Sequence, residues 1–518
     1  MTSTAIDAGD GLPLTIPALL RARVAARGAS VLLACDDDVL TWAEAERRSA
    51  ALARGLLAAG AGPGTRIGLL FPNGSAFVAG WLAAARIGAT SVPLSTFSTA
   101  AELRALLRNA DVAMLLSATS YRSHDYEAVL REIAPGLGTD APLFVASLPV
   151  LRRIFFSERE LTGSGHSVDP GVLSAAEEAV RPGDRLTIVH TSGSTGAPKG
   201  VIHTHGALIR HLDNLNQIRR YSPDEVLFSN SPFFWIGGLA YSLLGTLVSG
   251  GKLVCSNAPS AAGVLDVLER ERPTLVNGFA QSVAHLPHDP SFAKRDLSSI
   301  RRGNLYPILP DAVRPADPEL RHAMLGMTET GSVCLVCEDE SDQPETRRGS
   351  FGRPAPGLEA AVVEGELWLR GTFMMEGYCG RERHEVFDGE GWYRTGDCFT
   401  VDEDGFFYFQ GRRGDMIKTS GANVSPREVE AAIAQLTGLT AHVIGLPDAA
   451  RGQIVAAALR VPADRAIDVD ALEDELAKQL SSYKVPRRFL LLRDEAVPML
   501  ASGKLDRPRL EALFADVG

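Results

Sequence analysis

Residues 190–200 read HTSGSTGAPKG, a run of hydroxyl side chains and glycines that closes with a lysine. The β-rich run RLTIVH precedes it at 185–190, and Leu208, Leu212 and Leu215 recur behind it at helical spacing. Glycines let backbone N–H groups approach an oxyanion closely, hydroxyls add donors, and a lysine adds positive charge. The stretch is therefore interpreted as a phosphate-binding loop between a strand and a helix, with a plain flexible turn as the alternative. The candidate phosphate ligands are Thr191, Ser192, Gly193, Ser194, Thr195, Gly196 and Lys199.

Two familiar loops do not match these letters. The Walker pattern requires glycine before the lysine and Ser or Thr after it, whereas Lys199 lies between Pro198 and Gly200. The hydrolase elbow GxSxG fails because neither Ser192 nor Ser194 has a glycine two positions earlier. The loop therefore belongs to another class of phosphate binder.

Length and charge bound the class of protein. A chain of 518 residues is too long for one hydrophobic core, so two or more domains are expected. Its 45% hydrophobic and 22% charged residues are ordinary for a globular protein. A formal net charge of −11, with no block of lysines or arginines, argues against nucleic acid and anionic membrane surfaces as partners.

Three observations favour a cytoplasmic protein. The six cysteines are scattered, which is typical of reduced thiols, and the CxxC at 334–337 has no second pair to complete a zinc site. The N-terminal MTSTAIDAGDG lacks the basic and apolar regions of a secretory signal. Residues 230–251 carry no charge, but Pro232 and five glycines favour a buried helix and strand over a transmembrane segment.

The order of elements predicts an α/β fold. Strands are predicted at 66–71 and 90–94 with a helix over 75–87 between them, a βαβ alternation typical of a largely parallel sheet. The same rhythm continues over 102–117. Residues 145–184 are expected to form a surface connector, because their charges are mixed and SGSGHSVDPG lies at their centre.

A change in the predicted secondary structure toward the C-terminus indicates a second domain. The preceding chain is rich in strands punctuated by glycines, whereas helices are predicted near 427–436 and 468–480. We expect a large N-terminal α/β domain of several subdomains over 1–410 and a small α+β domain over 411–518. The segment GRRGD at 411–415 is the predicted interdomain hinge.

Four charged residues beyond the loop are candidates for nucleotide chemistry. Glu329 lies beside Thr328 in MLGMTET, and a carboxylate near phosphates is how proteins hold Mg²⁺. Asp397 ends GWYRTGD, where a carboxylate can accept from two vicinal ribose hydroxyls. An exposed acidic turn is the alternative for Glu329, and solvated surface charge is the alternative for Asp397, Arg412 and Lys504.

Together these motifs resemble the signatures of the adenylate-forming (AMP-binding) superfamily, in its branch of acyl-CoA synthetases and carboxylate–CoA ligases. TSGSTGAPKG, MLGMTET, GWYRTGD, GRRGD and SGK occur in the family's order, and the likeness extends from about Thr41 to Leu505. The resemblance implies ATP, Mg²⁺ and CoA as cofactors and a small carboxylic acid as substrate. It implies that the acid and MgATP give an acyl-adenylate and pyrophosphate, after which a thiol displaces AMP.

The resemblance also implies roles for single residues. Glu329 holds Mg²⁺, Thr328 contacts phosphate, and Asp397 and Arg412 reach the ribose. Lys504 joins the α-phosphate to the substrate carboxylate, where a cation offsets the repulsion of two anions and the charge that develops in the transition state. Thr328, Glu329 and Lys504 are therefore the predicted catalytic residues.

The family's adenine loop and mobile C-terminal domain have counterparts here. The predicted adenine loop comprises Met324, Leu325 and Gly326. Leu325 stands where the family usually has a tyrosine that stacks on adenine. The small domain rotates between the half-reactions in this family, and the pivot two residues after the ribose arginine is Gly414, which tolerates varied φ. Ser420 and Gly421 are the predicted CoA-binding residues.

The acceptor and the acid are less sharply defined. CoA is the favoured thiol, because no aspartate suited to an α-amino group follows 232–235, and the spacing from Glu329 to 349–354 is short for a fatty-acyl-AMP ligase. A carrier-protein thiol, another nucleophile, a non-carboxylate oxyacid and nucleotide binding without turnover stay open. A homodimer is a further candidate assembly. Trp235 and Gly303 are candidates for the acyl pocket, with core packing as the alternative for Trp235, and an aryl, alicyclic or medium-sized acid is favoured.

Overall fold

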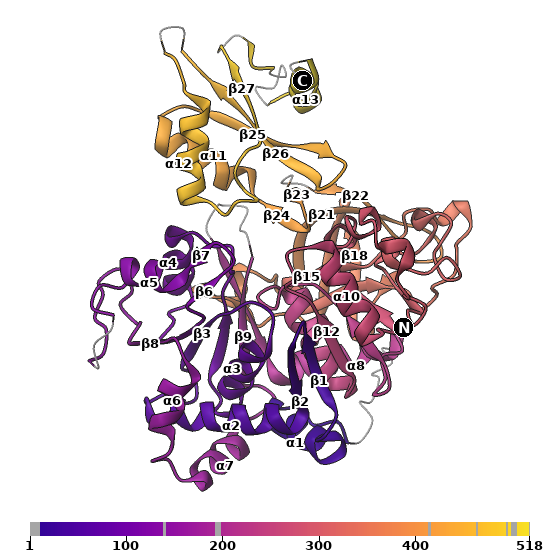
Figure 1. The fold of residues 1–518 in the computed structure, drawn as a ribbon. Coiled ribbons are helices and arrows are strands. Elements are labelled where there is room, and N and C mark those ends of the chain that lie inside the picture. The colour runs from indigo at the N-terminus through magenta and orange to yellow at the C-terminus, as the bar shows by residue number, and fades with distance from the viewer. Residues whose placement is uncertain are drawn as a thin grey trace. The chain divides into compact units, whose positions relative to one another are not determined.

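The computed structural model describes residues 11–137, 141–191, 198–412, 416–462, 465–493, 496–498 and 505–516. The chain divides into two compact units (Figure 1). The large unit comprises residues 1–96, 106–191 and 200–411, and the small unit comprises 97–105, 192–199 and 412–518.

A seven-stranded sheet organises the first part of the large unit. Its strands are β3 (Arg66–Leu70), β4 (Thr90–Pro93), β5 (Met114–Ser117), β8 (Arg153–Phe155), β9 (Arg185–Thr191), β10 (Lys199–Thr204) and β20 (Gly377–Tyr378). Their order is β20-β10-β9-β4-β3-β5-β8, and the run from β9 to β8 is parallel. Every residue of β4 and β5 is buried, as expected for parallel strands covered on both faces. The predicted α/β class is confirmed.

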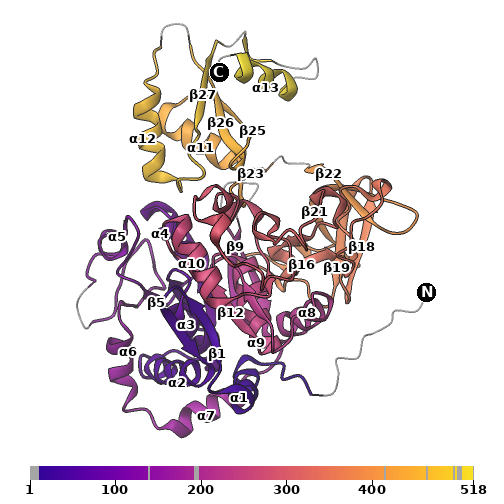
Figure 2. The same cartoon turned by 45° about the vertical axis from the view of Figure 1, so that its right-hand side comes forward.

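Helices pack around this sheet. Their bounds are α1 (Ile16–Arg27), α2 (Trp42–Ala58), α3 (Ser75–Arg86), α5 (Tyr126–Ile133), α6 (Glu158–Gly165) and α7 (Pro170–Ala179). The remaining helix of this part of the sequence, α4 (Ala100–Asn109), begins among the residues assigned to the small unit. Helix α3 connects the parallel strands β3 and β4 and is buried along nearly its whole length. Helix α2 begins where the Thr41 hydroxyl accepts from Glu44 N at 3.2 Å, and it packs against α3 and α6 (Figure 2).

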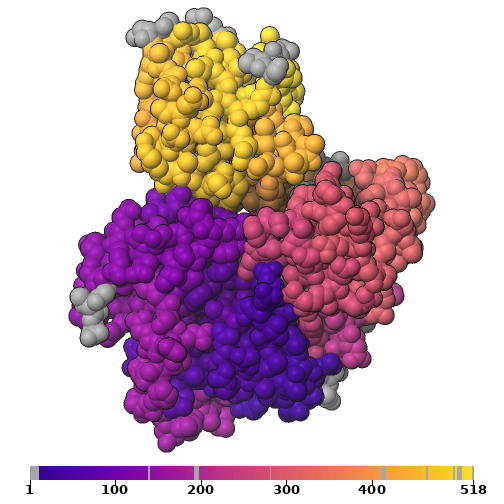
Figure 3. All heavy atoms as spheres, viewed as in Figure 1, coloured from indigo at the N-terminus to yellow at the C-terminus, as the bar shows by residue number. Residues whose placement is uncertain are grey.

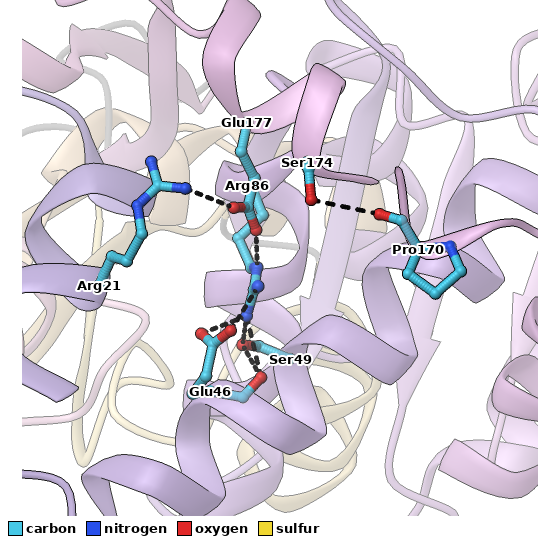
Figure 4. Close-up of polar contacts among 7 residues, drawn as sticks. All are labelled: Arg21, Glu46, Ser49, Arg86, Pro170, Ser174 and Glu177. Carbon is cyan, nitrogen blue, oxygen red and sulfur yellow. Dashed lines mark hydrogen bonds and ion pairs between the residues drawn. The ribbon is translucent and has the colours of Figure 1, made fainter. Parts of the chain in front are cut away.

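Residues 145–184 do not form the expected surface connector. They supply strand β8 and helices α6 and α7, and Leu161 and Leu173 are buried. Figure 4 shows Glu177 of α7 facing Arg86 of α3: Arg86 Nε donates to Glu177 Oε1 at 2.5 Å. Nη1 and Nη2 of Arg86 donate to Glu46 at 2.6 and 2.8 Å. The mixed charge of this segment therefore includes an interior ion pair, so its pattern did not indicate burial.

A second sheet lies in the same unit. Its strands are β1 (Val31–Cys35), β2 (Asp38–Thr41), β11 (Val226–Phe228), β12 (Lys252–Cys255), β13 (Leu275–Val276) and β14 (Arg302–Gly303), in the order β14-β13-β11-β12-β1-β2. It joins residues 31–41 to residues 226–303, and atoms from these distant parts of the sequence lie side by side on the surface (Figure 3). The helices beside it are α8 (His205–Ile218), α9 (Gly245–Ser249), α10 (Ala261–Glu271) and a π-helix, η1 (Gly237–Leu244).

Short antiparallel sheets complete the large unit. They contain β6 (Ser120–Tyr121), β7 (His124–Asp125), β15 (Leu325–Met327), β16 (Ser332–Val336), β17 (Arg353–Pro354), β18 (Leu358–Val363), β19 (Glu366–Gly371), β21 (Tyr393–Val401) and β22 (Phe407–Arg412). Between β15 and β16, residues 328–330 form a one-turn 3₁₀ helix, η7 (Thr328–Thr330), which ends at Gly331 with φ of +72°.

The small unit is α+β, as predicted. It contains β23 (Ile417–Thr419), β24 (Ala422–Val424), α11 (Pro426–Thr437), β25 (Ala441–Asp448), β26 (Gly452–Arg460), α12 (Val469–Gln479), β27 (Arg488–Leu492) and α13 (Arg507–Asp516). Its hydrophobic clusters draw on residues from 417 onward, whereas the large unit has its own cores around Trp42, Phe77 and Trp81 and around Phe228 and Leu265. Each unit therefore buries an apolar core of its own.

Candidate functional site

The phosphate loop lies between two strands of the large sheet. Strand β9 ends at Thr191 and β10 begins at Lys199, while Ser192, Gly193, Ser194, Thr195 and Gly196 lie outside the described residues. The strand predicted before the loop is confirmed. The predicted helix, α8, begins only at His205, after the further strand β10. Buried Val201 and Ile202 pair with β20, which explains why this short apolar run is a strand.

The acidic turn 328–330 is held by strands β9 and β10. His203 of β10 donates from Nε2 to the Thr328 carbonyl at 2.6 Å, and strand β9 also contacts η7. Burial lowers the pKa of His203 to about 4, so its imidazole is neutral and keeps one N–H for this bond. The strands on both sides of the phosphate loop therefore fix the position of Thr328 and Glu329.

The Glu329 carboxylate is oriented by Tyr378. The Tyr378 hydroxyl donates to Glu329 Oε1 at 2.8 Å and lies 2.9 Å from the Tyr393 hydroxyl. Met375 N donates to the Glu329 carbonyl at 2.8 Å, which fixes the backbone as well. Burial, reinforced by the nearby Glu329 carboxylate, raises the pKa of Tyr378 far above its usual value. Tyr378 is therefore a permanent hydrogen-bond donor to Glu329.

This carboxylate fits the magnesium role that the sequence implies. Mg²⁺ in nucleotide sites takes only one or two protein carboxylates and completes its octahedron with phosphates and waters. A single half-buried glutamate whose orientation is fixed by Tyr378 satisfies that requirement. The described ranges contain no group of three or more His, Cys, Asp and Glu residues suited to a metal held by protein alone.

Asp397 and the predicted adenine loop share a neighbour, Cys334. The Cys334 thiol donates to the Leu325 carbonyl at 3.3 Å. Burial raises the pKa of this thiol to about 12, and the Asp397 charge acts in the same direction. Asp397 is buried on β21, and its N–H donates to the Thr395 hydroxyl at 3.0 Å. Cys334 of β16 therefore contacts the predicted adenine loop and lies close enough to the predicted ribose carboxylate for its charge to act on the thiol.

A cavity of about 300 Å³ connects the adenine loop with the predicted acyl pocket. Met324 and Gly303 both line it, as do Tyr241, Asn304 and Tyr306. A Cβ at Gly303 would lie 1.9 Å from the Val276 carbonyl oxygen, and φ there is +129°, so only glycine fits.

Trp235 is not among the residues that line this cavity. Its ring packs edge-on against Phe234 and Phe279, with centroids 5.4 and 6.0 Å apart. An acyl-pocket role for Trp235 stays a prediction.

The remaining predicted residues fall in or near the small unit. Ser420 and Gly421 form the two-residue turn between β23 and β24, with φ of +50° and +83°, as a type I′ hairpin requires. The exposed Ser420 donates from its backbone N–H to the Arg451 carbonyl at 2.8 Å. Arg412 is the last residue of β22, whereas Gly414 and Lys504 lie outside the described residues.

Sequence reasoning missed Tyr378 and His203 as supports of the acidic turn. Tyr378 belongs to a Gly-Tyr pair between GELWLRG and GWYRTGD, and its place in that string was the available signal. His203 lies three residues after Gly200, the end of the predicted phosphate loop. A single histidine in a buried strand does not reveal from the sequence which residue it contacts. Among helices in the described ranges, none has the length and apolar character needed to cross a membrane.

Comparison with known proteins agrees with this geometry. Residues 20–379 match the AMP-binding enzyme family, and residues 428–504 match the AMP-binding enzyme C-terminal domain. Feruloyl-CoA synthase of Amycolatopsis sp is 32% identical, covering 92% of this chain and 94% of the relative. Sulfoacetate–CoA ligase of Cupriavidus necator is 28% identical, with coverages of 96% and 97%.

A solved structure extends the likeness to the fold. The amide bond synthetase McbA from Marinactinospora thermotolerans superimposes with a TM-score of 0.77 at 26% identity, covering 96% of this chain and 99% of that one. The match of the first family spans well over half of the chain, and the loop, acidic turn and ribose carboxylate occur in its order. The chain therefore belongs to the AMP-binding enzyme family of adenylate-forming acyl-CoA synthetases and ligases.

Proposed function

We propose that this protein activates a carboxylic acid with MgATP and transfers the acyl group to the thiol of CoA. The observation that carries the proposal is the fixed position of Glu329: β9 and β10, which flank the phosphate loop, contact its turn, and Tyr378 orients its carboxylate. This arrangement fixes a carboxylate against the two strands that flank the predicted phosphate loop in the sequence.

In the first half-reaction, the substrate carboxylate oxygen attacks the α-phosphorus and pyrophosphate leaves. Glu329 would hold Mg²⁺, which supplies charge neutralisation for the phosphates when bound. The loop residues 191–199 and Thr328 bind phosphate oxygens, and Asp397 and Arg412 orient the ribose. Lys504 binds the α-phosphate and the acid together, which reduces the repulsion between the two anions.

In the second half-reaction, the CoA thiolate attacks the acyl carbonyl and AMP leaves with its phosphate. The Ser420–Gly421 turn is the proposed contact for pantetheine. Its left-handed backbone brings β23 and β24 together tightly, so the turn is a compact, exposed tip of the small unit. We place the protein in the cytoplasm, with a carrier protein as an alternative acceptor and a homodimer as a candidate assembly.

A second candidate acceptor is an amine. The amide bond synthetase shares this fold over nearly the whole chain at 26% identity. An amine can displace AMP from the same acyl-adenylate, because the first half-reaction does not depend on the acceptor. The relatives named for feruloyl-CoA and sulfoacetate differ widely in their acids, so their names do not transfer a substrate to this chain.

The test is pyrophosphate release from ATP, Mg²⁺ and a panel of carboxylic acids, with and without CoA, and with mass detection of the acyl product. We expect acid-dependent pyrophosphate release and an acyl-CoA that appears only with CoA. Glu329→Gln and Lys504→Ala are each expected to lower the rate by about 10²- to 10³-fold, as for the loss of one oxyanion donor. Pyrophosphate release that is absent with every acid would show nucleotide binding without turnover, and an amide formed in preference to a thioester would favour the amine acceptor.

A further inference from the structure

We propose that the acid substrate carries a second anionic group, such as a distal carboxylate or sulfonate, and that Arg219 binds it in the 300 Å³ cavity. This inference rests on the proposed function and names its substrate class. Arg219 lines the same cavity as Gly303 and Met324, and it is not one of the residues that the sequence motifs single out.

Arg219 is a buried guanidinium with only neutral partners. Its side chain follows the end of α8, and the residue is 5% exposed. Nε and Nη2 donate to Asn216 Oδ1 at 3.0 and 2.7 Å, and Nη2 also donates to the Tyr241 carbonyl at 2.7 Å. The guanidinium carbon lies 4.9 and 4.0 Å from the ring centroids of Tyr221 and Tyr241. These contacts orient the cation but supply no negative charge.

One nitrogen of this group has no partner. Arg219 Nη1 is buried and makes no hydrogen bond within the described part of the chain. A buried cationic donor without an acceptor is costly, because it has lost its hydration without replacement. Burial lowers the pKa of Arg219 accordingly.

The other arginines of the cavity wall each have a carboxylate partner, although Arg301 and Arg302 share one. Arg301 and Arg302 donate to Glu225 Oε1 at 2.8 and 3.1 Å, and Arg321 donates to Asp342 Oδ1 at 2.5 Å. No carboxylate lies within salt-bridge distance of Arg219 among the residues that the structure describes. Arg219 is therefore the arginine of the cavity lining that has no carboxylate partner within the described residues.

Two acidic residues also line the cavity, and they do not cancel this preference. Asp339 and Glu340 are exposed, whereas Arg219 is fully enclosed. Exposed charges are screened by water and salt, so a buried charge acts more strongly on a ligand inside the cavity. Tyr241 further ties the cation to the reaction centre, since its hydroxyl donates to Met324 Sδ at 3.5 Å while its carbonyl accepts from Arg219.

The test compares acids of matched length with and without a second charge. Pyrophosphate release is measured with adipate against hexanoate and with terephthalate against benzoate. We expect the parental enzyme to prefer the dicarboxylate in each pair, and Arg219→Met to lower kcat/KM for the dicarboxylate by about 10- to 100-fold, mainly through KM, because a hydrogen-bonded charge is lost. Arg219→Lys, which keeps the charge, should retain part of the preference.

Arg301→Gln is the matched control, because Arg301 lines the same cavity but is paired with Glu225 and exposed. Its preference for the dicarboxylate should equal that of the parental enzyme. A purely structural role of Arg219 would lower both acids of a pair alike, and an unchanged ratio in Arg219→Met overturns the proposal while adenylation stands. Calorimetric titration of adipate and hexanoate without ATP decides the same question if no acid is turned over: adipate binding lost in Arg219→Met supports the proposal, and equal binding of both acids contradicts it.

Discussion

Tyr378 is the residue on which the geometry of Glu329 depends. A carboxylate that binds a divalent cation must present its oxygens in one orientation, and a side chain that rotates freely would pay entropy on binding. The Tyr378 hydroxyl fixes Glu329 Oε1 at 2.8 Å and cannot become a competing anion, because its pKa is raised well beyond neutral pH. Orientation is thus supplied by a neutral group that adds no charge to the site.

Replacing Tyr378 with phenylalanine should weaken magnesium-dependent catalysis without unfolding the protein. The change removes one hydrogen bond to a charged group, worth about 1.5–3 kcal/mol, and keeps the ring. We expect the Mg²⁺ concentration for half-maximal pyrophosphate release to rise by about tenfold. Titrating Mg²⁺ at saturating ATP measures this.

Tyr393→Phe is the control, since the Tyr393 hydroxyl lies 2.9 Å from the Tyr378 hydroxyl, and Tyr378 is the residue that donates to Glu329. Its effect on the magnesium requirement should be small. A Tyr378→Phe enzyme with parental magnesium dependence would remove Tyr378 from the proposed support of Glu329.

At the scale of elements, helix α7 is attached to α3 through an interior ion pair. Glu177 is 8% exposed and Arg86 is 4% exposed, and Glu177 also accepts from Arg21 at 3.3 Å (Figure 4). Removing one member of a buried pair leaves an uncompensated charge, which costs more than the pair itself contributes.

Glu177→Ala should therefore destabilise the large unit. Breaking a buried pair costs about 3–5 kcal/mol, and Glu46 retains part of the Arg86 interaction, so about 3 kcal/mol is expected. The measurement is the midpoint of thermal unfolding followed by tryptophan fluorescence, because buried Trp81 lies in the same helix as Arg86. The neighbouring and exposed Glu178→Ala should leave the midpoint unchanged; equal midpoints for both variants would contradict a structural role for the pair.

Largely apolar elements are predicted from the sequence, whereas those in the mixed-charge segment 145–184 are not. Strand β3 and helix α3 are largely apolar, and glycines lie between the three elements β3, α3 and β4, so the predicted ends fall within one residue of those observed. Helices α6 and α7 are not predicted, because the charged residues of this segment suggest exposure. Glu177 of α7 is charged but buried.

The candidate site shows the same division. Glu329 and Asp397 lie in short strings with glycine turns, which sequence motifs capture. Arg219 and Tyr378 act through partners distant in sequence, Tyr241 and Glu329, and no spacing rule connects them. Pairings of this kind are set by packing between elements and become visible only in three dimensions.

At the scale of the whole molecule, the chain has two units with separate cores. Units that do not share a core can move as bodies when the linking backbone allows it. We propose Gly414 as that point, on the family resemblance and on the conformational freedom of glycine.

Gly414→Pro should separate the two half-reactions. Proline fixes φ near −65° and would restrict rotation at the pivot. Pyrophosphate release should persist in a single turnover, while thioester formation should slow by at least about tenfold, a barrier increase of about 1.4 kcal/mol. Gly414→Ala, which restricts φ less, serves as the control. Thioester formation at the parental rate in Gly414→Pro would show that the pivot lies elsewhere.

The cavity lining contains one position, Gly303, that cannot be substituted, and other positions that can. No side chain fits at Gly303, because the Val276 carbonyl would lie 1.9 Å from its Cβ, so this part of the cavity is pure backbone. The backbone here is held by the pairing of β13 with β14, so side-chain substitutions elsewhere should change its shape little. Other lining residues, among them Arg219, Tyr241 and Met324, have side chains that can be exchanged. A search for variants with new acid specificity should therefore vary those three positions and keep Gly303 unchanged.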